Sequence, residues 1–418
     1  MKLFTDLHIH SKFARGCSKD LTIENIIFWS KLKGLQLLGT GDFTHPLWLK
    51  ELKEKLIEVE NGIFQDKKNR EIYFILTSEI NLIFLRNREV KRMHLIIGVP
   101  SFEAAEKINN NLRKFGSIES DGRPTLKIDV IDFISLVFSI DEKIMIIPAH
   151  IWTPWFSLFG SKSGFNSITE AFADYSQYIT ALETGLSSNP QMNWRLSQLD
   201  NFSIVSFSDA HSAYPHRLGR EATFIEIENI SYDNVYQALK NKNSKNKIIL
   251  TIEFFPEEGK YHFDGHRLCG ISFSPKESKK FNNICPVCYK PLVIGVMHRV
   301  ENLADRDENF IDQNRPTFYQ FVPLSEIIAK LLKTEPTNKK VLDIYQNIVK
   351  KFVNEFEILI KKYQDEEFKK DYPEISNIID KIHQKKIKII PGYDGEYGKI
   401  IFEDINQPDK KLKQESLF

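Results

Sequence analysis

Short apolar segments alternate with polar loops and amphipathic helices along the first half of the chain. Strands that alternate with helices in this way are typical of an α/β fold with parallel strands. Seven such strands favour a barrel over an open sheet. The apolar segments with the length and composition of strands lie at 3–9, 35–39, 73–80, 94–99, 143–148, 179–183 and 203–208.

The helix between the first two strands has clear boundaries. Thr22 is a suitable amino-terminal cap, and Gly34 can adopt the left-handed conformation that ends a helix. Ile23, Ile26 and Ile27 form an apolar face between them. The pattern therefore predicts a helix from Thr22 to Gly34.

The alternation ends near residue 231, which predicts further domains. A polar, basic segment covers 239–247, and three of the four cysteines lie within 260–300. Apolar residues at helical spacing dominate from residue 324 to residue 363. We expect a metal-dependent catalytic barrel at 1–230, a linker and zinc-binding module at 231–322, a helical region at 323–390 and a tail at 391–418.

Composition narrows the class of protein. The chain has 418 residues, a 42% apolar fraction and a net charge of +1, so it can form a large core and has no global basic field, although local basic surfaces that bind DNA are compatible with a neutral total. No apolar run is long enough to span a membrane, no signal-peptide pattern opens the sequence, and four cysteines do not form a disulfide scaffold. We expect a soluble, cytoplasmic protein. No glycine-rich nucleotide-binding motif is present.

Side chains that bind metals lie at or near the end of almost every predicted strand. His8 and His10 are one residue apart in "DLHIH", so both imidazoles face the same side of a strand. In (β/α) barrels the carboxyl ends of the strands form the rim that carries the active site. The other members of this set are Asp42 and His45 in "GTGDFTH", Glu79 in "TSEI", His94, His150, Glu183, Asp209 and His211.

This number of nitrogen and carboxylate ligands exceeds one tetrahedral site, and it predicts two or three divalent metal ions. Zinc, manganese, magnesium and iron are the candidates for a mixed imidazole and carboxylate set. Two metals about 3.5–4 Å apart stabilise an in-line displacement at phosphorus and lower the pKa of a bound water. The chemistry of the residues therefore favours hydrolysis of a phosphate ester.

These motifs occur in an order that resembles the PHP (polymerase and histidinol phosphatase) superfamily, whose fold is a distorted (β/α)7 barrel with a trinuclear metal site. Longer stretches resemble the endonuclease Q family: "AHIWTPWFSLFGSKSGFNSITEAF", "LETGLSSNPQMNWRLSQLD" and "DGHRLC" followed by "CPVC". The resemblance covers nearly the whole chain. It implies an enzyme that cuts DNA on the 5′ side of uracil, hypoxanthine, xanthine and abasic sites.

The resemblance also implies roles for the residues that match its motifs. Glu79, Asp209 and His150 are the residues expected at the catalytic centre. One metal would be held by His8, His10, Glu79 and Asp209, a second by Glu79, His94 and His150, and a third by Asp42 and His211.

One departure affects the third metal. PHP enzymes often have another histidine soon after the His-x-His pair, where this chain has Ala14, Arg15, Gly16 and Cys17. The third site is therefore expected to be weak, empty or completed by Cys17. His45 and Glu183 are each a ligand or a residue that orients one.

A second ligand group has the spacing of a zinc ribbon. His266-x-x-Cys269 is followed, after fifteen residues, by Cys285-x-x-Cys288. His262 and His298 are alternatives for the fourth ligand, but His266 completes a second pair with the same spacing. Four ligands leave no open position, so we expect a structural zinc ion.

Aromatic and polar residues near His150 suggest contacts with DNA or with a damaged base. An enzyme that acts on one nucleotide of a duplex must take its base out of the stack and bind it in a pocket. The alternative is that about half of the aromatic side chains belong to the core. The candidates are Trp152, Trp155, Phe159, Lys162, Ser187, Asn189, Asn193, Arg195, Arg217 and Arg267.

Two other functions are alternatives to a DNA endonuclease. A PHP phosphatase of small phosphomonoesters would not need the zinc module and the helical region, and a DNA-binding protein with a degenerate barrel would not keep the ligand series. At the end of the chain, Gln414, Leu417 and Phe418 resemble a shortened form of the motif that binds the sliding clamp PCNA. The alternative is a terminus without a partner.

Overall fold

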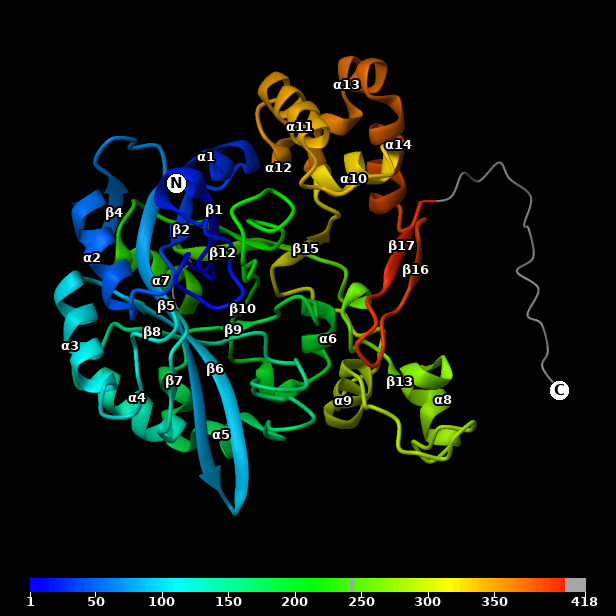
Figure 1. Cartoon of the computed structure of the whole chain (residues 1–418), viewed down its shortest axis with the longest axis horizontal. Coiled ribbons are helices and arrows are strands. Elements are labelled where there is room, and N and C mark those ends of the chain that lie inside the picture. The colour runs from blue at the N-terminus through cyan, green and yellow to red at the C-terminus, as the bar shows by residue number, and fades with distance from the viewer. Residues whose placement is uncertain (241–243, 403–418) are drawn as a thin grey trace.

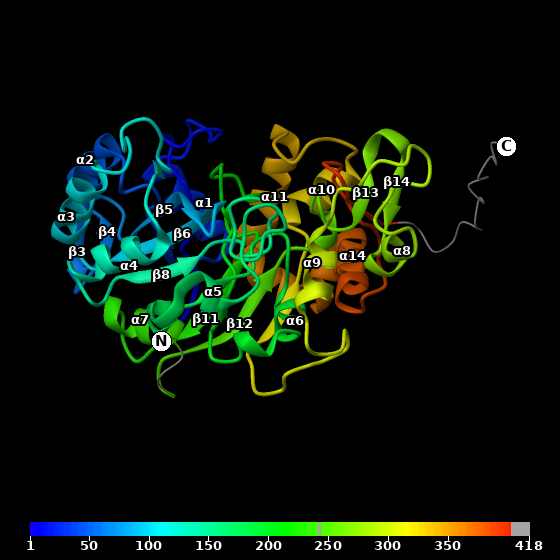
Figure 2. The same ribbon diagram turned by 90° about the horizontal axis from the view of Figure 1, so that it is seen from below.

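The computed structural model describes residues 1–240 and 244–402, and it is a mixed α/β protein with a helical region in its carboxyl-terminal third (Figure 1). Helices α2, α3 and α4 lie at one end of the molecule, α8 and β13 lie toward the other end, and α10, α11 and α14 lie between them (Figures 1 and 2). The helices are α1 (Ile23–Lys33), α2 (Pro46–Lys55), α3 (Phe102–Leu112), α4 (Val130–Phe138), α5 (Ile168–Phe172), α6 (Pro190–Trp194), α7 (Tyr232–Lys240), α8 (Pro275–Lys280), α9 (Val296–Leu303), α10 (Leu324–Leu331), α11 (Lys339–Lys351), α12 (Glu355–Ile360), α13 (Glu366–Asp371) and α14 (Pro373–His383). Short 3₁₀ turns are η1 (Ala173–Tyr178), η2 (Ser197–Leu199), η3 (Pro256–Glu258), η4 (Arg267–Cys269) and η5 (Lys362–Gln364).

An eleven-stranded sheet forms the centre of the molecule, and three pairs of strands lie outside it. The main path through the sheet is β15-β12-β11-β1-β2-β5-β4-β3, with β6 and β7 also paired to β5 and with β8 paired to β6. Its strands are β1 (Lys2–Asp6), β2 (Leu37–Gly39), β3 (Leu56–Glu60), β4 (Ile63–Asp66), β5 (Tyr73–Arg86), β6 (Glu89–Val99), β7 (Thr125–Leu126), β8 (Met145–Pro148), β11 (Ala222–Glu226), β12 (Lys247–Glu253) and β15 (Thr317–Gln320). The separate pairs are β9 (Leu182–Glu183) with β10 (Ile204–Val205), β13 (Asp264–His266) with β14 (Ile271–Phe273), and β16 (Lys388–Ile390) with β17 (Lys399–Ile401).

A strand occurs at each of the seven predicted positions, but the strands are not all parallel. β1, β2 and β5 are parallel to one another, whereas β5 and β6 form a long antiparallel hairpin, and β8 is antiparallel to β6. Asn87 and Arg88 at the hairpin turn have φ angles of 53° and 67°, the left-handed conformation that a two-residue hairpin requires. The prediction of parallel strands throughout is therefore wrong at this hairpin.

β9 and β10 lie between β8 and β1. The amide of Thr180 donates to the carbonyl of Ile146 within β8, and the amide of Ile151, just after β8, donates to the carbonyl of Glu183 at the end of β9. After β10, Ala210 forms a parallel bridge with Ile9, which follows β1. These links bring the ends of β8, β10 and β1 close together.

The predicted first helix is confirmed in detail. The Thr22 hydroxyl accepts a hydrogen bond from the amide of Asn25, and Gly34 ends the helix at φ 100°. Near the end of this helix, Lys33 forms a fully buried ion pair with Glu355 of α12, with 2.8 Å between Nζ and Oε1. Because Glu355 also accepts the amide of Leu324 and the hydroxyl of Tyr345, one carboxylate fixes the helical region to the sheet domain.

Two structural features bear on the predicted domain boundaries. The sheet continues past residue 230, because β12 pairs with β11 and β15 pairs with β12. The boundary at residue 390 lies between the paired strands β16 and β17.

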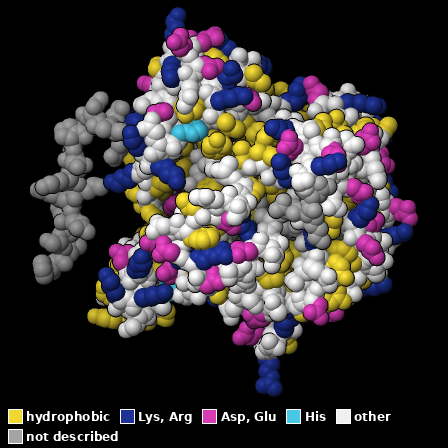
Figure 3. Space-filling view, turned by 180° about the vertical axis from the view of Figure 1, so that it is seen from behind, with side chains coloured by type: hydrophobic (Ala, Val, Ile, Leu, Met, Phe, Trp, Pro, Cys, Tyr) yellow, Lys and Arg dark blue, Asp and Glu magenta, His cyan; other side chains and the backbone are white. Residues whose placement is uncertain are grey.

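Basic and acidic side chains are interspersed on the face shown in Figure 3, which agrees with a net charge of +1. Within the described residues, no helix has both the length and the apolar content that a membrane crossing requires.

Candidate metal centre

Residues from distant parts of the chain meet where the ends of several strands come together. His8 and His10 follow β1, Glu79 lies on β5, and Asp209 follows β10. His94 lies inside β6 rather than at its end. Because β6 runs antiparallel to β5, His94 is opposite Asn81, two residues from Glu79. The hairpin therefore reaches the same region from the opposite direction.

The first ligand group contains His8, His10, Glu79 and Asp209, whose ligand atoms lie within 4.8 Å of one another. The Nε2 atom of His8 is 3.6 Å from Glu79 Oε1 and 3.6 Å from Asp209 Oδ1. This nitrogen is buried and has no hydrogen-bond partner. An unpaired buried imidazole nitrogen facing two carboxylates fits a divalent cation.

The second ligand group contains Glu79, His94 and His150. Glu79 Oε1 lies 2.6 Å from His94 Nδ1 and 3.1 Å from His150 Nε2. The other oxygen of the same carboxylate, Oε2, lies 3.4 Å from His10 Nε2. Glu79 therefore belongs to both groups and is placed to bridge two ions.

Burial and charge oppose each other in the first group. Burial by itself lowers the pKa of His8, but the carboxylates of Glu183, Asp209 and Glu79 outweigh it and raise that pKa well above its usual value. Burial also raises the pKa of Glu79, but the neighbouring imidazoles, His94 first, hold it well below its usual value. The carboxylates therefore stay ionised in a buried site and attract cations.

Several residues of this site have strained backbones. Asp42, His150 and Asp209 have φ angles of 48°, 31° and 47°, which side chains with a Cβ atom rarely adopt. Gly185 makes room for one of them, since a Cβ atom there would lie 2.3 Å from the Cβ of His150. Such strain is common where residues are held for function.

Two carboxylates hold the imidazoles in place. Glu183 Oε1 lies 2.9 Å from His8 Nδ1, and its Oε2 accepts the amide of His150 at 2.6 Å. Asp42 Oδ1 lies 3.0 Å from His10 Nδ1, and its Oδ2 accepts the amide of Ser11. Each carboxylate binds the ring nitrogen that faces away from the ligand group, which is how metal-binding imidazoles are usually oriented.

Asp42 and His211, the residues expected around a third ion, belong to no group of three or more ligand atoms within 4.8 Å of one another among the described residues. Asp42 is occupied by His10, and His211 lies nearer to solvent with Nδ1 2.9 Å from the carbonyl of Asp209. His45 contacts the carbonyl of Glu119 instead. Burial raises the pKa of Cys17 to about 12, so its thiol is protonated at neutral pH.

The cysteine motif forms a separate ligand group. His266, Cys269, Cys285 and Cys288 have ligand atoms within 4.8 Å of one another. His298 instead pairs with Asp264 at 2.5 Å, and His262 is likewise outside the group. Although burial opposes it, hydrogen bonds from the amides of Cys288 and Val287 lower the pKa of Cys285 to about 7, which favours the thiolate that binds metal.

The residues predicted to contact DNA fall into two sets. Trp152, Phe159, Asn189, Asn193 and Arg195 have internal roles, for Trp152 donates to Asn193, Asn189 caps α6 and Arg195 pairs with Glu301 of α9. Four of these side chains are buried, and Asn189 is half-buried. The members that reach solvent at least in part are Trp155, Lys162, Ser187, Asn189, Arg217 and Arg267.

Arg123 is a member of the site that the sequence analysis missed. Its Nη1 atom lies 3.1 Å from Glu79 Oε2, and its side chain is 25% exposed. It lies in a loop between α3 and β7, far in sequence from the ligand motifs. The only local signal is the turn sequence "SDGRPT", which does not indicate a metal site.

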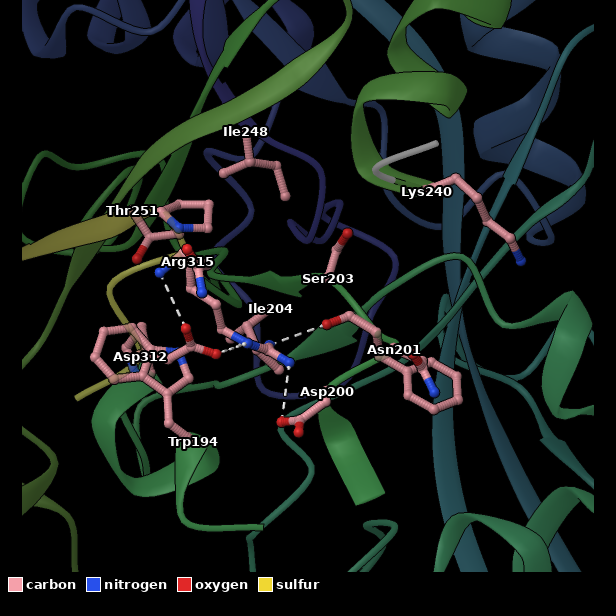
Figure 4. Close-up of a pocket in the computed structure, with 14 residues that line it drawn as sticks. Trp194, Asp200, Asn201, Ser203, Ile204, Lys240, Ile248, Thr251, Asp312 and Arg315 are labelled. Atoms are coloured by element: carbon pink, nitrogen blue, oxygen red, sulfur yellow. Dashed lines mark hydrogen bonds and ion pairs between the residues drawn. The ribbon is translucent and has the colours of Figure 1, made fainter. Parts of the chain in front are cut away.

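A cavity of about 340 Å³ lies apart from both ligand groups, near the start of β10 (Figure 4). Arg315 crosses it and is held by the carboxylates of Asp312 and Asp200 and by the carbonyls of Phe202 and Leu199. Its charge is thus already satisfied by the protein.

Together, the fold and the shared carboxylate define a mixed α/β protein with a two-part candidate metal centre. The lesion-specific endonuclease PfuEndoQ from Pyrococcus furiosus has a similar structure, with a TM-score of 0.84 and 31% identity over 96% of this chain and 95% of that chain. A structure of endonuclease Q with a 27-mer duplex that carries an abasic lesion at the active site gives a TM-score of 0.84 and 30% identity, covering 96% of each chain. The chain belongs to the endonuclease Q family.

A sequence relative and a family model each match part of the chain. An uncharacterized protein of Methanocaldococcus jannaschii, MJ0043, is 35% identical over 255 residues. The match covers 61% of this chain and 32% of that protein, so the chain spans about a third of the relative's length. The family model of the MJ0043 C-terminal domain matches residues 323–386, which form most of the helical region.

Proposed function

We propose that this protein is a DNA repair endonuclease that hydrolyses the phosphodiester on the 5′ side of deaminated bases and abasic sites. The observation that carries the proposal is the pair of ligand groups joined by Glu79. It occurs in a chain that is similar over nearly its whole length to an endonuclease Q solved with an abasic-site duplex.

We interpret the strands from β1 to β10 as a distorted PHP barrel, with the metal centre at its rim. His8, His10, Glu79 and Asp209 would hold one divalent ion, and Glu79, His94 and His150 would hold a second. Two such ions, when bound, stabilise the charge that develops on a phosphate during in-line attack and make a bound water acidic. Zinc, manganese, magnesium and iron remain the candidates, because the ligands mix imidazole and carboxylate.

The chain's own residues would organise that chemistry. Glu79 holds the two ligand groups next to each other, because one of its oxygens faces His94 and the other faces His10. Glu183 and Asp42 fix the rings of His8 and His10 in orientation. Asp209, with a side chain that is 24% exposed, forms part of the edge at which a phosphate group would enter.

We further propose a division of labour among the predicted parts: catalysis by residues 1–230, a zinc module within 231–322, helices at 323–390 and a tail at 391–418. The zinc module would hold one structural zinc ion between His266, Cys269, Cys285 and Cys288. In that module Arg299 of α9 donates to the carbonyls of Phe159 and Phe165. This contact ties the module to the segment that follows His150.

Exposed members of the predicted DNA surface supply the remaining contacts in this proposal. Trp155 is 37% exposed and packs at a ring distance of 5.3 Å against Tyr261, so aromatic groups from two segments meet at the surface. Aromatic faces stack on unpaired bases. Lys162, Ser187, Arg217 and Arg267 would add polar and electrostatic contacts.

The predicted clamp motif at Gln414, Leu417 and Phe418 lies outside the described residues. We keep PCNA as a proposed partner. Deletion of 414–418 should leave the cutting of a short oligonucleotide unchanged and remove any stimulation by the cognate clamp. Equal stimulation of the deletion variant would contradict this proposal.

Labelled duplexes test the main proposal directly. Each duplex carries one uracil, hypoxanthine, xanthine or abasic site, and an undamaged duplex serves as the control. Incubation with and without chelator should give a single cut 5′ of the lesion that depends on metal. Equal cutting of undamaged DNA would indicate a general nuclease, and release of phosphate from small monoesters alone would indicate a phosphatase.

A further inference from the structure

Arg123 lies at the boundary between the metal-ligand cluster and solvent. Its guanidinium contacts Glu79 Oε2 at 3.1 Å, while Glu79 itself is fully buried. The side chain of Arg123 is 25% exposed, close to the value of 24% for Asp209. Together with His211, whose side chain is 36% exposed, these two side chains form the solvent-facing edge of the site.

The loop that carries Arg123 is firmly built. Asp121 Oδ1 accepts the amides of Arg123 and Arg15 at 3.1 and 3.0 Å. The amide of Gly122 donates to the carbonyl of Phe13, and its carbonyl accepts the hydroxyl of Thr44. A backbone held on both sides delivers its side chain to a defined place.

The same loop is fixed to the strand that carries Glu79. The carbonyl of Pro124 accepts the amide of Asn81, which is two residues beyond Glu79 on β5. On the other side, Gly122 packs so closely on Asp42 that a Cβ atom would lie 2.5 Å from Oδ2. The loop is therefore held in place next to both Asp42 and Glu79.

A permanent positive charge at this position needs an anion. Arginine stays protonated in proteins, and its planar fork binds carboxylates and phosphates through paired hydrogen bonds. Divalent ions that share Glu79 would repel Arg123 and take up the carboxylate that it contacts. The guanidinium would then be available to another anion that approaches the same edge.

We propose that Arg123 is a catalytic residue that binds the phosphate group of the substrate at the edge of the metal cluster. This inference rests on the proposed function, for which it names the group that holds the scissile phosphodiester. Together with the cations, Arg123 would surround the phosphate oxygens with positive charge, which stabilises the extra charge of the transition state.

Three variants test the inference. Arg123→Gln removes the charge, and Arg123→Lys keeps the charge but not the planar fork. Arg15→Gln is the matched control, because Arg15 interacts with the same Asp121 but is 77% exposed and has no contact with Glu79. Each variant is loaded with metal, its metal content is measured, and its affinity for inorganic phosphate is determined by calorimetry before any DNA is used.

We expect Arg123→Gln to keep its metal content while it binds inorganic phosphate about 10- to 100-fold more weakly, the range for loss of a charged hydrogen bond. Its kcat/KM on an abasic-site duplex should fall about 10²- to 10³-fold. Arg123→Lys should lie between Arg123→Gln and the wild type, and Arg15→Gln should match the wild type.

Two results would overturn the inference. Wild-type phosphate affinity in Arg123→Gln would show that the guanidinium does not bind the substrate, and loss of metal in that variant would show that it stabilises the ligand cluster instead. Failure of the proposed function looks different, because the wild-type protein would then cut no lesion-bearing DNA. The phosphate measurement does not depend on that outcome.

Discussion

The two ligand groups of this protein are built in opposite ways. The cluster around Glu79 draws His8 and Asp209 from distant parts of the sequence, buries most of its ligands and leaves an edge open to solvent. The cysteine cluster takes all four ligands from residues 266–288, in a module outside the main sheet. A complete set of four sulfur and nitrogen ligands is typical of a structural ion, whereas an open, mixed cluster is typical of a catalytic one.

The two clusters differ in how metal binding and folding depend on each other. The fold must be formed before the ligands around Glu79 can meet, so an ion there depends on the fold. In the cysteine module the ligands are close in sequence, and few apolar side chains are buried between them, so we expect the fold of the module to depend on the proposed ion. Loss of a ligand should therefore reduce activity in the Glu79 cluster and reduce stability in the cysteine cluster.

The largest effect is expected for Glu79→Gln. The neutral amide of glutamine has a single, uncharged oxygen in place of two anionic ones, so it is a poor bridge between two ions, and cutting of an abasic-site duplex should fall at least about 10³-fold. The variant should lose metal from the Glu79 cluster and keep the zinc of the cysteine cluster. Glu89→Gln, an exposed change on the same hairpin, is the control. Near-normal cutting by Glu79→Gln would contradict a catalytic role for the Glu79 cluster.

Cys285→Ser should act on stability before activity. Loss of one ligand from a closed zinc site removes folding free energy, so we expect one equivalent of zinc to be lost and Tm to fall by about 5 °C or more. Cys17→Ser is the control, because Cys17 lies outside the group. If Cys285→Ser keeps its zinc and its Tm, the cysteine cluster does not hold a structural ion.

Glu183→Gln should have a smaller effect on the Glu79 cluster. Its carboxylate orients His8 from the side away from the ligand group, and loss of such a partner typically weakens metal binding about 10- to 100-fold. Cutting should recover when the metal concentration is raised by the same factor. The exposed change Glu142→Gln serves as the control. Activity that stays low at saturating metal would make Glu183 a ligand in its own right.

The smallest effect is expected at buried carboxylates outside the two clusters, where a substitution should change only how stability depends on pH. Burial raises the pKa of Glu253 from 4.5 to about 7, against hydrogen bonds from Ser206 and Thr251, and it raises that of Glu221 as well. The folded protein therefore holds protons that the unfolded chain has released, and the free energy of unfolding falls as pH rises from about 4.5 to about 7.

Glu253→Gln should remove part of this pH dependence. Between about pH 5 and 8, the Tm of the metal-saturated variant should fall by a few degrees less than the Tm of the wild type. The reason is that each unit of pKa shift corresponds to about 1.4 kcal/mol of stability. Glu228→Gln, an exposed change after β11, should follow the wild type. Parallel curves for the wild type and Glu253→Gln would contradict the raised pKa.

The sequence predicted the local features of this molecule better than the distant ones. The first helix, the ligand grouping of the cysteine motif and the choice of His266 depend on short spacings, and the structure agrees with them. The direction of β6 was missed because its partner β5 is longer than the predicted strand, and the turn at Asn87 and Arg88 is a weak signal.

Candidate site residues show the same limit. Asp42 stays a predicted ligand, and its contact with His10 is set by the packing of two strands and could not be read from spacing. Trp152 and Arg195 look like surface contacts because of their types, yet each is satisfied by a partner inside the protein. Arg123 carries no motif, and only the fold brings it to Glu79.

Stepwise metal reconstitution tests the central claim most directly. Protein stripped of the ions around Glu79, with the cysteine cluster still loaded, is titrated with one divalent metal while bound equivalents and cutting of an abasic-site duplex are measured together. If Glu79 joins two ions in one centre, cutting should remain low until the second equivalent binds and should then reach its maximum. Full cutting with one bound equivalent, or with none, would contradict the account.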